Sequence, residues 1–362
     1  MLSLIALTPP MWCIFAQHQT EYRRDVPTDH GRTRVAGAPR WMLVLSIALV
    51  TTLAGALGIV RATNAQMDKV GHIPEVTAVL SPASDGFENY LLVGSDSRET
   101  ADASDEDFAV VGSEEANPGR RSDTMIVVHV NTKDSSVSTM SIPRDLWARM
   151  GDSDRYNKIN SAYQRGSDVL VRTVQRALNI PIHHYVEVNF SGFKEIVDAI
   201  GGVHVCVDHA SRDKATGFYI GKKACKLQSG ADALRYARSR HFEEKIDGEW
   251  RLEGTGDVGR GDRQRAFMTM LAKDAAKFLA QHPLQTNKVL ASFAQAVTVD
   301  EGLDLIDFGR KLKPLGLGNS HSFNLPVNSD MSHGTFSFSI DNAKGQPILA
   351  YFAGMAPAPA AE

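Results

Sequence analysis

The 362-residue chain has few cysteines and no excess of charge of either sign. Three cysteines are too few for a fold built on disulfides. The formal net charge of −3, from 39 basic and 42 acidic residues, argues against a general nucleic-acid binder. G-x-x-x-x-G-K-[ST] and G-x-S-x-G motifs are missing, as are paired histidines at zinc spacing. The adjacent residues His183 and His184 are therefore expected to be structural.

One long uncharged run is present, and it predicts a membrane anchor. Residues 41–60, WMLVLSIALVTTLAGALGIV, lie between Arg40 and Arg61. A helix needs about 20 apolar residues to cross the hydrocarbon layer, so we expect a single transmembrane helix here. A buried core helix and a cleaved signal peptide are the alternatives. The arginines before the run are Arg23, Arg24, Arg32, Arg34 and Arg40. The positive-inside rule then predicts a cytoplasmic tail at 1–40 and places the remainder outside the cell membrane.

Cys206 and Cys225 are the only cysteines in the predicted outer part, and they are 19 positions apart. In an oxidising compartment this spacing predicts a disulfide. The alternative is a pair of small buried hydrophobic residues. Cys13 lies on the other side of the predicted span and should stay reduced.

Strand and helix patterns alternate along the outer part and predict an α/β domain with layers of helices on a sheet. A juxtamembrane linker is expected at 61–88, the domain at 89–350 and a loose tail at 351–362. Strands are predicted at 89–93, 124–130, 137–142, 185–188, 203–207 and 335–340. Helices are predicted at 167–178, 191–200, 230–240, 261–281 and 284–298, and residues 241–258 are expected to form a flexible loop.

Carboxylates and arginines occur together at three predicted strand ends: GSDSR (94–98), GRRSD (119–123) and SIPRD (141–145). Ligands bind at strand ends in α/β sheets. Aspartate oxygens suit Mg²⁺ or Mn²⁺, and arginine forks suit phosphate, so this combination fits a diphosphate–metal complex. Each pair taken alone could equally be a local salt bridge or a turn. A fourth segment, YARSRH (236–241) with GDVGRGDRQ (256–264), adds arginines and glycines at a helix start, where an anion can bind. A solvated basic patch is the alternative there.

Together these motifs resemble the LytR–CpsA–Psr (LCP) family from about Asn89 to Phe267. The residues concerned are NYLLVGSDSR (89–98), GRRSDTMIVVHVN (119–131), SIPRDL (141–146), KINSAY (158–163), FKEIVDAIGGVHVCV (193–207), LQSGADALRYARSRH (227–241) and GDVGRGDRQR (256–265). The resemblance rests on their order and spacing, because no single motif is decisive.

The resemblance implies a phosphotransferase that moves a glycopolymer from a polyprenyl-diphosphate carrier to peptidoglycan, with the prenyl chain in an apolar pocket of the α/β domain. Asp96 and Asp123 would hold Mg²⁺ (or Mn²⁺). Arg121, Arg144, Arg238 and Arg260 would bind the diphosphate, with Arg144, Arg238 and Arg260 in catalytic roles. Further candidates for the diphosphate are Arg98, Lys158, Arg240 and Arg263. Asp257 would act as the base or orient a catalytic arginine.

The sequence departs from the family pattern at Asp232, where many relatives have glutamine. A carboxylate beside a diphosphate would repel it, so Asp232 must be turned away, paired or metal-linked. The external disulfide and the Ala/Pro-rich tail suggest an actinobacterial member, which favours arabinogalactan as cargo over teichoic acid or capsule.

Three other functions remain open at this stage. A prenyl-diphosphate hydrolase would use water in place of the sugar hydroxyl. A non-catalytic module would bind the lipid diphosphate without transfer. A membrane-bound transcriptional attenuator would need a cytoplasmic DNA-binding module, and about 40 residues at the N-terminus are too few for one.

Overall fold

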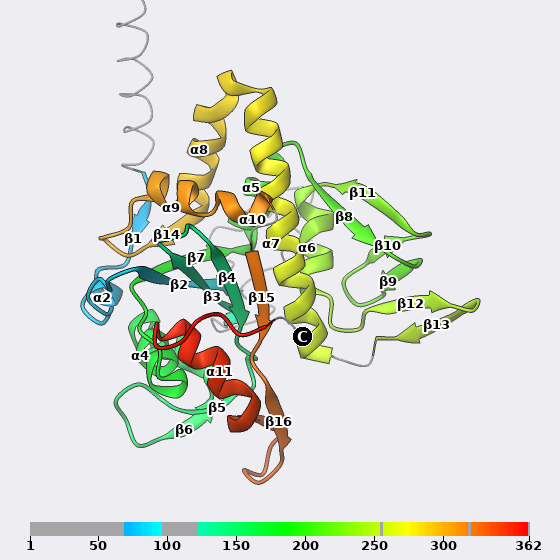
Figure 1. Ribbon diagram of the computed structural model, residues 1–362. Helices are drawn as coiled ribbons and strands as arrows, with labels where there is room; N and C mark the ends of the chain where they lie inside the picture. Colours follow the sequence, from blue (N-terminus) through cyan, green and yellow to red (C-terminus); the bar gives the residue numbers. More distant parts are fainter. Residues whose placement is uncertain (1–68, 96–121, 254–255, 318–319, 361–362) are drawn as a thin grey trace, which may run out of the picture. The chain divides into compact units, whose positions relative to one another are not determined.

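The computed structural model describes residues 69–95, 122–253, 256–317 and 320–360 (Figure 1). The side chains of Asp123 and of residues 256–258 are not described. The predicted cytoplasmic tail and transmembrane helix lie outside these ranges. Within the ranges, no helix is both long and apolar enough to span a bilayer.

A mixed sheet of seven strands forms the centre of the domain (Figure 1). In spatial order its strands are β1 (Gly71–His72), β14 (Val297–Val299), β7 (His184–Asn189), β2 (Phe87–Ser95), β3 (Ser122–Asn131), β4 (Val137–Ser141) and β15 (Ser320–Asn324). β2 is parallel to β7 and antiparallel to β3, β3 is antiparallel to β4, and β4 is parallel to β15. The predicted hairpin at 124–142 is β3–β4.

Helices cover both faces of this sheet, as the layered prediction requires. α4 (Ser167–Leu178) and α11 (Asn342–Phe352) pack on one face, together with α2 (Pro74–Thr77). The other face carries α8 (Thr286–Ala296), α9 (Leu305–Lys311) and α10 (Lys313–Leu317), and α7 (Gly256–Gln281) adds Met268 and Ala272 there. Successive strand residues alternate between the two cores, so Tyr90 faces α9 and Leu91 faces α4.

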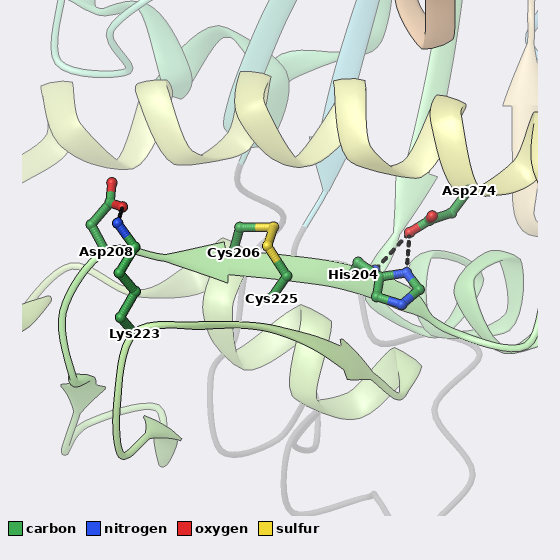
Figure 2. The surroundings of a disulfide bond; sticks show 6 residues. All are labelled: His204, Cys206, Asp208, Lys223, Cys225 and Asp274. Atoms are coloured by element: carbon green, nitrogen blue, oxygen red, sulfur yellow. Dashed lines mark hydrogen bonds and ion pairs between the residues drawn. A yellow bond between two sulfur atoms is a disulfide. The ribbon is translucent and has the colours of Figure 1, made fainter.

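A third core lies beside the sheet, between α5 (Phe190–Ala199), α6 (Gly230–Arg238) and α7. Two small sheets extend from it: β8 (Val203–Val207) with β11 (Ala224–Gln228), and β10 (Phe218–Ile220), β9 (Ser211–Asp213), β12 (Glu243–Ile246) and β13 (Glu249–Leu252). Cys206 and Cys225 are directly opposite in the β8–β11 register and form the expected disulfide (Figure 2). The bond links β8 to β11 through two exposed side chains of this two-stranded sheet.

The remaining elements lie around the ends of the sheet. They are β5 (Trp147–Arg149), β6 (Tyr156–Lys158), the 3₁₀ helices η1 (Ile159–Arg165) and η2 (Pro283–Gln285), and the hairpin of β16 (Val327–Asp330) and β17 (Ser337–Ile340).

Three predicted irregular segments contain regular structure. The loop expected at 241–258 is the β12–β13 hairpin followed by the start of α7. Asp247 and Gly248 both have positive φ at its tip, and such Asp-Gly pairs favour the tight turns of two-residue hairpins. The described part of the expected linker contributes β1 and α2, and the expected C-terminal tail begins inside α11.

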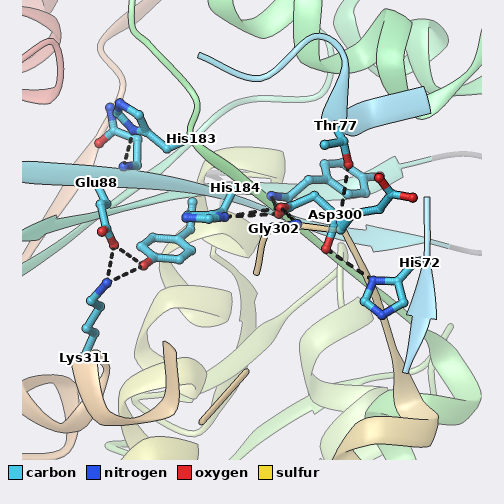
Figure 3. Close-up of polar contacts among 12 residues, drawn as sticks. His72, Thr77, Glu88, His183, His184, Asp300, Gly302 and Lys311 are labelled. Atoms are coloured by element: carbon cyan, nitrogen blue, oxygen red, sulfur yellow. Dashed lines mark hydrogen bonds and ion pairs between the residues drawn. The ribbon is translucent and has the colours of Figure 1, made fainter. Parts of the chain in front are cut away.

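The histidines expected to be structural lie in buried polar contacts (Figure 3). His184 contacts the carboxylate of Asp300, which also accepts the backbone N–H of Tyr185 at 2.9 Å. His183 belongs to a set that we call the histidine cluster: Ser84, Asn89, His129 and His183. The backbone N–H of Asn89 donates to His183 Nδ1 at 2.8 Å, and its side-chain oxygen accepts from His129 Nδ1 at 2.8 Å.

Burial lowers the pKa of both His129 and His183 to about 4. The Asn89 amide nitrogen donates to the carbonyls of Pro181 and Phe352, which joins α11 to the sheet.

Candidate functional site

Five strands of the central sheet have polar residues at the ends that lie along one edge of the sheet. β2, β4, β7 and β15 end there and β3 begins there, because the register pairs Ser95 with Ser122 and Asn189, and Ser141 with Asn324. The described residues of the three strand-end motifs, at 94–95, 122–123 and 141–145, therefore lie at this edge. This is where α/β sheets bind ligands.

The β2–β3 pairing is irregular at this edge. Gly94 pairs with Thr124 and Ser95 with Ser122, so Asp123 is the extra residue of a bulge. Bulges are common next to functional sites, where they redirect a side chain. Gly94 cannot be replaced without movement, because a Cβ there would lie 2.9 Å from Thr124 Cβ. The backbone thus brings Asp123 next to the end of β2, which Asp96 follows in the sequence.

A small cleft opens at the same edge and contains two of the predicted arginines. It is lined by Thr124, Met125, Ser141, Ile142, Pro143, Arg144, Arg260, Gly261, Gln264, Asn324 and Leu325. Arg144 and Arg260 are 116 positions apart, yet they come together here from the β4–β5 connection and from α7. The cleft is small, with a cavity volume of about 30 Å³. The expected lipid pocket is larger than this cleft and stays a prediction.

Arg144 and Lys158 share a carboxylate. Arg144 Nε lies 3.4 Å from one oxygen of the buried Asp145, and Lys158 Nζ lies 2.9 Å from the other. The backbone N–H of Asn160 also donates to the Arg144 carbonyl at 3.1 Å, which joins η1 to this turn. Two cations flanking one carboxylate leave a positive charge beside the cleft.

Arg260 is buried in the first turns of α7, with 3% of its surface exposed. Gly261 lies against the end of β4, where a Cβ would meet the Ser141 side chain at an ordinary contact distance of 3.4 Å. The Ser141 hydroxyl donates to the Gly261 carbonyl at 3.4 Å. This contact between α7 and β4 brings Arg260 to the cleft.

The other predicted arginines come from α6 and α7 and are held by their surroundings. Arg263 is paired with Glu253, donates to the Ser239 carbonyl at 2.8 Å and stacks on Phe242 at 4.6 Å. The Arg238 guanidinium lies 4.4 Å from the ring centre of Phe190, the residue that follows β7. Arg238 thus lies near the edge of the sheet where β7 ends, and Arg240 is two residues further along the chain.

Two cleft-side residues were missed in the sequence. Arg265 is buried, pairs with Asp262 and donates to Ser322 Oγ at 2.7 Å, while its Nη1 has no partner among the described residues. Burial lowers the pKa of Arg265, although Asp262 opposes this effect. Gln264 lines the cleft and donates to the Ala237 carbonyl at 3.1 Å. The spacing of Arg260 and Gln264, four positions apart on one helix, was the available signal.

Several predicted residues cannot be placed. Asp96, Arg98 and Arg121 lie outside the described residues, and the side chains of Asp123 and Asp257 are not described. The described side chains include no group of three His, Cys, Asp or Glu that could hold a metal. Asp232 pairs with Arg235 at 2.5 Å, which fulfils the expectation that it is turned away or paired.

The LytR_cpsA_psr family model matches residues 57–350. The chain belongs to this family. It is 35% identical over 198 residues to the polyisoprenyl-teichoic acid–peptidoglycan teichoic acid transferase TagU of Halalkalibacterium halodurans, covering 54% of this chain and 60% of that protein. It is 30% identical over 309 residues to the cell wall biosynthesis protein LcpA of Corynebacterium glutamicum, covering 75% and 56%. The chain thus spans 60% or less of the length of these two relatives.

Solved structures of other LCP proteins share the fold. A LytR-Csp2A-Psr enzyme from Actinomyces oris superimposes with a TM-score of 0.58 at 21% identity, over 78% of this chain and 96% of that one. A structure titled TagT bound to LI-WTA gives a TM-score of 0.55 at 22% identity, over 77% and 97%. These likenesses confirm the predicted α/β fold with its central sheet.

Proposed function

We propose that this LCP protein is a phosphotransferase that attaches a glycopolymer from a polyprenyl-diphosphate carrier to peptidoglycan. The observation that carries the proposal is that Arg144 and Arg260 line one cleft, at the edge of the sheet where β2 and β4 end. The names of the relatives TagU and LcpA support transfer of a wall polymer. Arginine forks stay charged and bind phosphate oxygens in pairs, so two of them can hold a diphosphate.

In the proposed reaction an acceptor sugar hydroxyl attacks the phosphorus nearest the glycopolymer. A new P–O bond forms to the acceptor, the bond to the bridging oxygen breaks, and the lipid monophosphate leaves. Arg144 and Arg260 stabilise the charge that spreads over the phosphate oxygens. Asp257 would take the hydroxyl proton or orient an arginine. Arg238, Arg240 and Lys158 would complete the binding of the diphosphate, with Arg98 and Arg121 as further candidates.

The direct test is a transfer assay with the full chain, a polyprenyl-diphosphate-linked glycan and peptidoglycan. Arg260→Ala is expected to reduce transfer about a thousandfold, because it removes charge stabilisation in the transition state. Arg172→Ala is the matched control, since Arg172 lies on α4, pairs with Asp152 and is half-exposed. Wild-type transfer by Arg260→Ala would contradict the assignment. Release of glycan phosphate without attachment would identify a hydrolase, and binding without any product would identify a carrier module.

We also propose that Asp96 and Asp123 hold Mg²⁺ or Mn²⁺. Support comes from the bulge that brings Asp123 to the end of β2, and from the buried Ser122 hydroxyl, which has no partner among the described residues. A bound divalent ion would neutralise the diphosphate. Titration calorimetry with MgCl₂ should show binding that Asp123→Asn weakens and Asp154→Asn leaves unchanged, because Asp154 is exposed beside Arg149. Unchanged binding in Asp123→Asn would contradict this site.

We further propose that residues 41–60 anchor the chain in the cell membrane with residues 62–362 outside. The support is the uncharged run and the arginines before it. Such an anchor would hold the site near a lipid-borne donor and raise its effective concentration. In intact cells, external protease should remove an epitope tag at the C-terminus and leave one at the N-terminus. The reverse pattern would contradict the orientation.

A further inference from the structure

The segment that joins α6 to β12 carries two of the proposed diphosphate ligands. Arg238 is the last residue of α6 and Arg240 lies two residues beyond it. Ser239 leaves the helix with φ −58° and ψ 127°. The Ser239 N–H still donates to the Tyr236 carbonyl at 3.1 Å, but residues 240 and 241 lie beyond the helix and must be held by other groups.

Asp213 holds this segment from one side. Its side chain is completely buried at the end of β9. Oδ2 accepts the Ser239 hydroxyl at 2.6 Å and the backbone N–H groups of Arg240 and His241 at 3.0 Å each. Oδ1 accepts the backbone N–H groups of Ala215 and Thr216 at 2.7 and 3.2 Å. One carboxylate thus ties the β9–β10 turn to the backbone on which Arg240 is mounted.

α7 holds the same segment from the opposite side. Arg263 Nη2 donates to the Ser239 carbonyl at 2.8 Å, and Gln264 Nε2 donates to the Ala237 carbonyl at 3.1 Å. Gln264 also lines the cleft with Arg260. Side chains of α7 thus bind the backbone carbonyls at the end of α6 and just beyond it, while Asp213 binds the backbone N–H groups that follow. The segment therefore has little freedom to rotate relative to the cleft.

The hydrogen bonds to Asp213 also stabilise the charged form of its carboxyl group. Burial alone would raise the pKa of its carboxyl, but the Ser239 hydroxyl and the backbone N–H groups bring the pKa below its usual value. The charged carboxylate is therefore the form that the fold binds.

We propose that Asp213 is a positioning residue for the transfer reaction: it sets the direction in which Arg238 and Arg240 approach the diphosphate. This inference rests on the proposed function. Its physical basis is that a buried, charged acceptor bonded to the Arg240 and His241 amides fixes the backbone between the two arginines. Displacements of about 1 Å in such groups can cost about a hundredfold in rate.

The first test is Asp213→Asn in the full chain. Asparagine places an N–H₂ group against backbone N–H donors, so the segment should shift. We expect kcat to fall about 10- to 100-fold, with a smaller change in the Kd for farnesyl diphosphate in the presence of Mg²⁺. Asp304→Asn is the matched control, because Asp304 accepts two backbone N–H groups at the start of α9, away from the cleft. It should leave kcat unchanged.

The second test asks whether Asp213 acts through the arginines. If it does, Asp213→Asn should lower kcat by a smaller factor in the Arg240→Ala background than in wild type, since coupled residues are not additive and only the effect through Arg238 remains. Full additivity would indicate a purely structural role and overturn the inference. Should Asp213→Asn fail to fold, Ser239→Ala removes only the 2.6 Å bond to Asp213 and should lower kcat about threefold.

The outcomes separate this inference from the proposed function. If Arg238→Ala and Arg240→Ala impair transfer while folded Asp213→Asn and Ser239→Ala transfer normally, only the positioning role of Asp213 fails. If both arginine variants transfer normally, their proposed part in diphosphate binding fails first.

Discussion

Two of the regions in which buried polar side chains gather in this domain, the histidine cluster and the surroundings of the cleft, differ in charge. In the histidine cluster, Asn89 matches donors to acceptors and both rings have a pKa lowered to about 4, so the cluster is neutral near pH 7. Around the cleft, arginines are held in the charged form against carboxylates and backbone carbonyls. The arginines and lysine described there are Arg144, Lys158, Arg260, Arg263 and Arg265.

The carboxylates described among them are fewer: Asp145, Glu253 and Asp262. Hydrogen bonding without charge stabilises a fold, whereas an excess of cations at an open edge binds an anion. We therefore expect the histidine cluster to serve the stability of the fold and the cleft to serve function.

Asn89→Ala should give the largest effect and should act on stability alone. It removes the side-chain bonds to Pro181, Phe352 and His129, and leaves buried partners unsatisfied. We expect the free energy of unfolding to fall by about 4 kcal/mol. Chemical denaturation measures this change, and kcat of the folded fraction should equal that of wild type. A loss of kcat in folded protein would mean that the two regions are coupled.

Arg144→Ala should act on transfer alone. It leaves the Lys158–Asp145 ion pair in place, so the β4–β5 turn keeps one of its side-chain contacts. We expect about a hundredfold loss of kcat/KM, or about 2.7 kcal/mol of transition-state stabilisation, with little change in the midpoint of thermal unfolding. Arg144→Lys should recover part of the loss, because it restores the charge without the fork. A large fall in the unfolding midpoint would show that Arg144 is structural.

Acid should weaken the histidine cluster and spare the arginines. Both rings bind protons more weakly in the folded state than in the unfolded state, so their contribution to stability is present above pH 6.5 and is lost as the pH falls toward 4. Between pH 7.5 and 5.5 we expect a loss on the order of 1 kcal/mol for each ring. His129→Gln should flatten this slope in urea titrations. An unchanged slope would mean that His129 has the same pKa in the folded and unfolded states.

Local patterns in the sequence were enough to predict the layers and much of the candidate site. A short apolar run marked β2, a hairpin pattern marked β3 and β4, and the strand-end motifs contained Arg144 and Asp123. The tight Asp247-Gly248 turn was overlooked because the charge of residues 241–258 suggested a loop, so the β12–β13 hairpin was missed.

Contacts between segments that are far apart in the chain could not be predicted from the sequence. Asp213 lies in a short polar segment without a motif, and its role depends on α6 ending beside β9. Arg263, a candidate for the diphosphate, pairs with Glu253 and donates to the Ser239 carbonyl, contacts with the preceding hairpin and helix that the sequence did not indicate. No local periodicity encodes such long-range pairings.

A crystal structure of the protein with farnesyl diphosphate and Mg²⁺ would test the central claim most directly. The account predicts that the guanidinium groups of Arg144 and Arg260 both donate to oxygens of the same diphosphate at the edge where β2 and β4 end. A diphosphate bound elsewhere, with these two side chains directed away from it, would contradict the account.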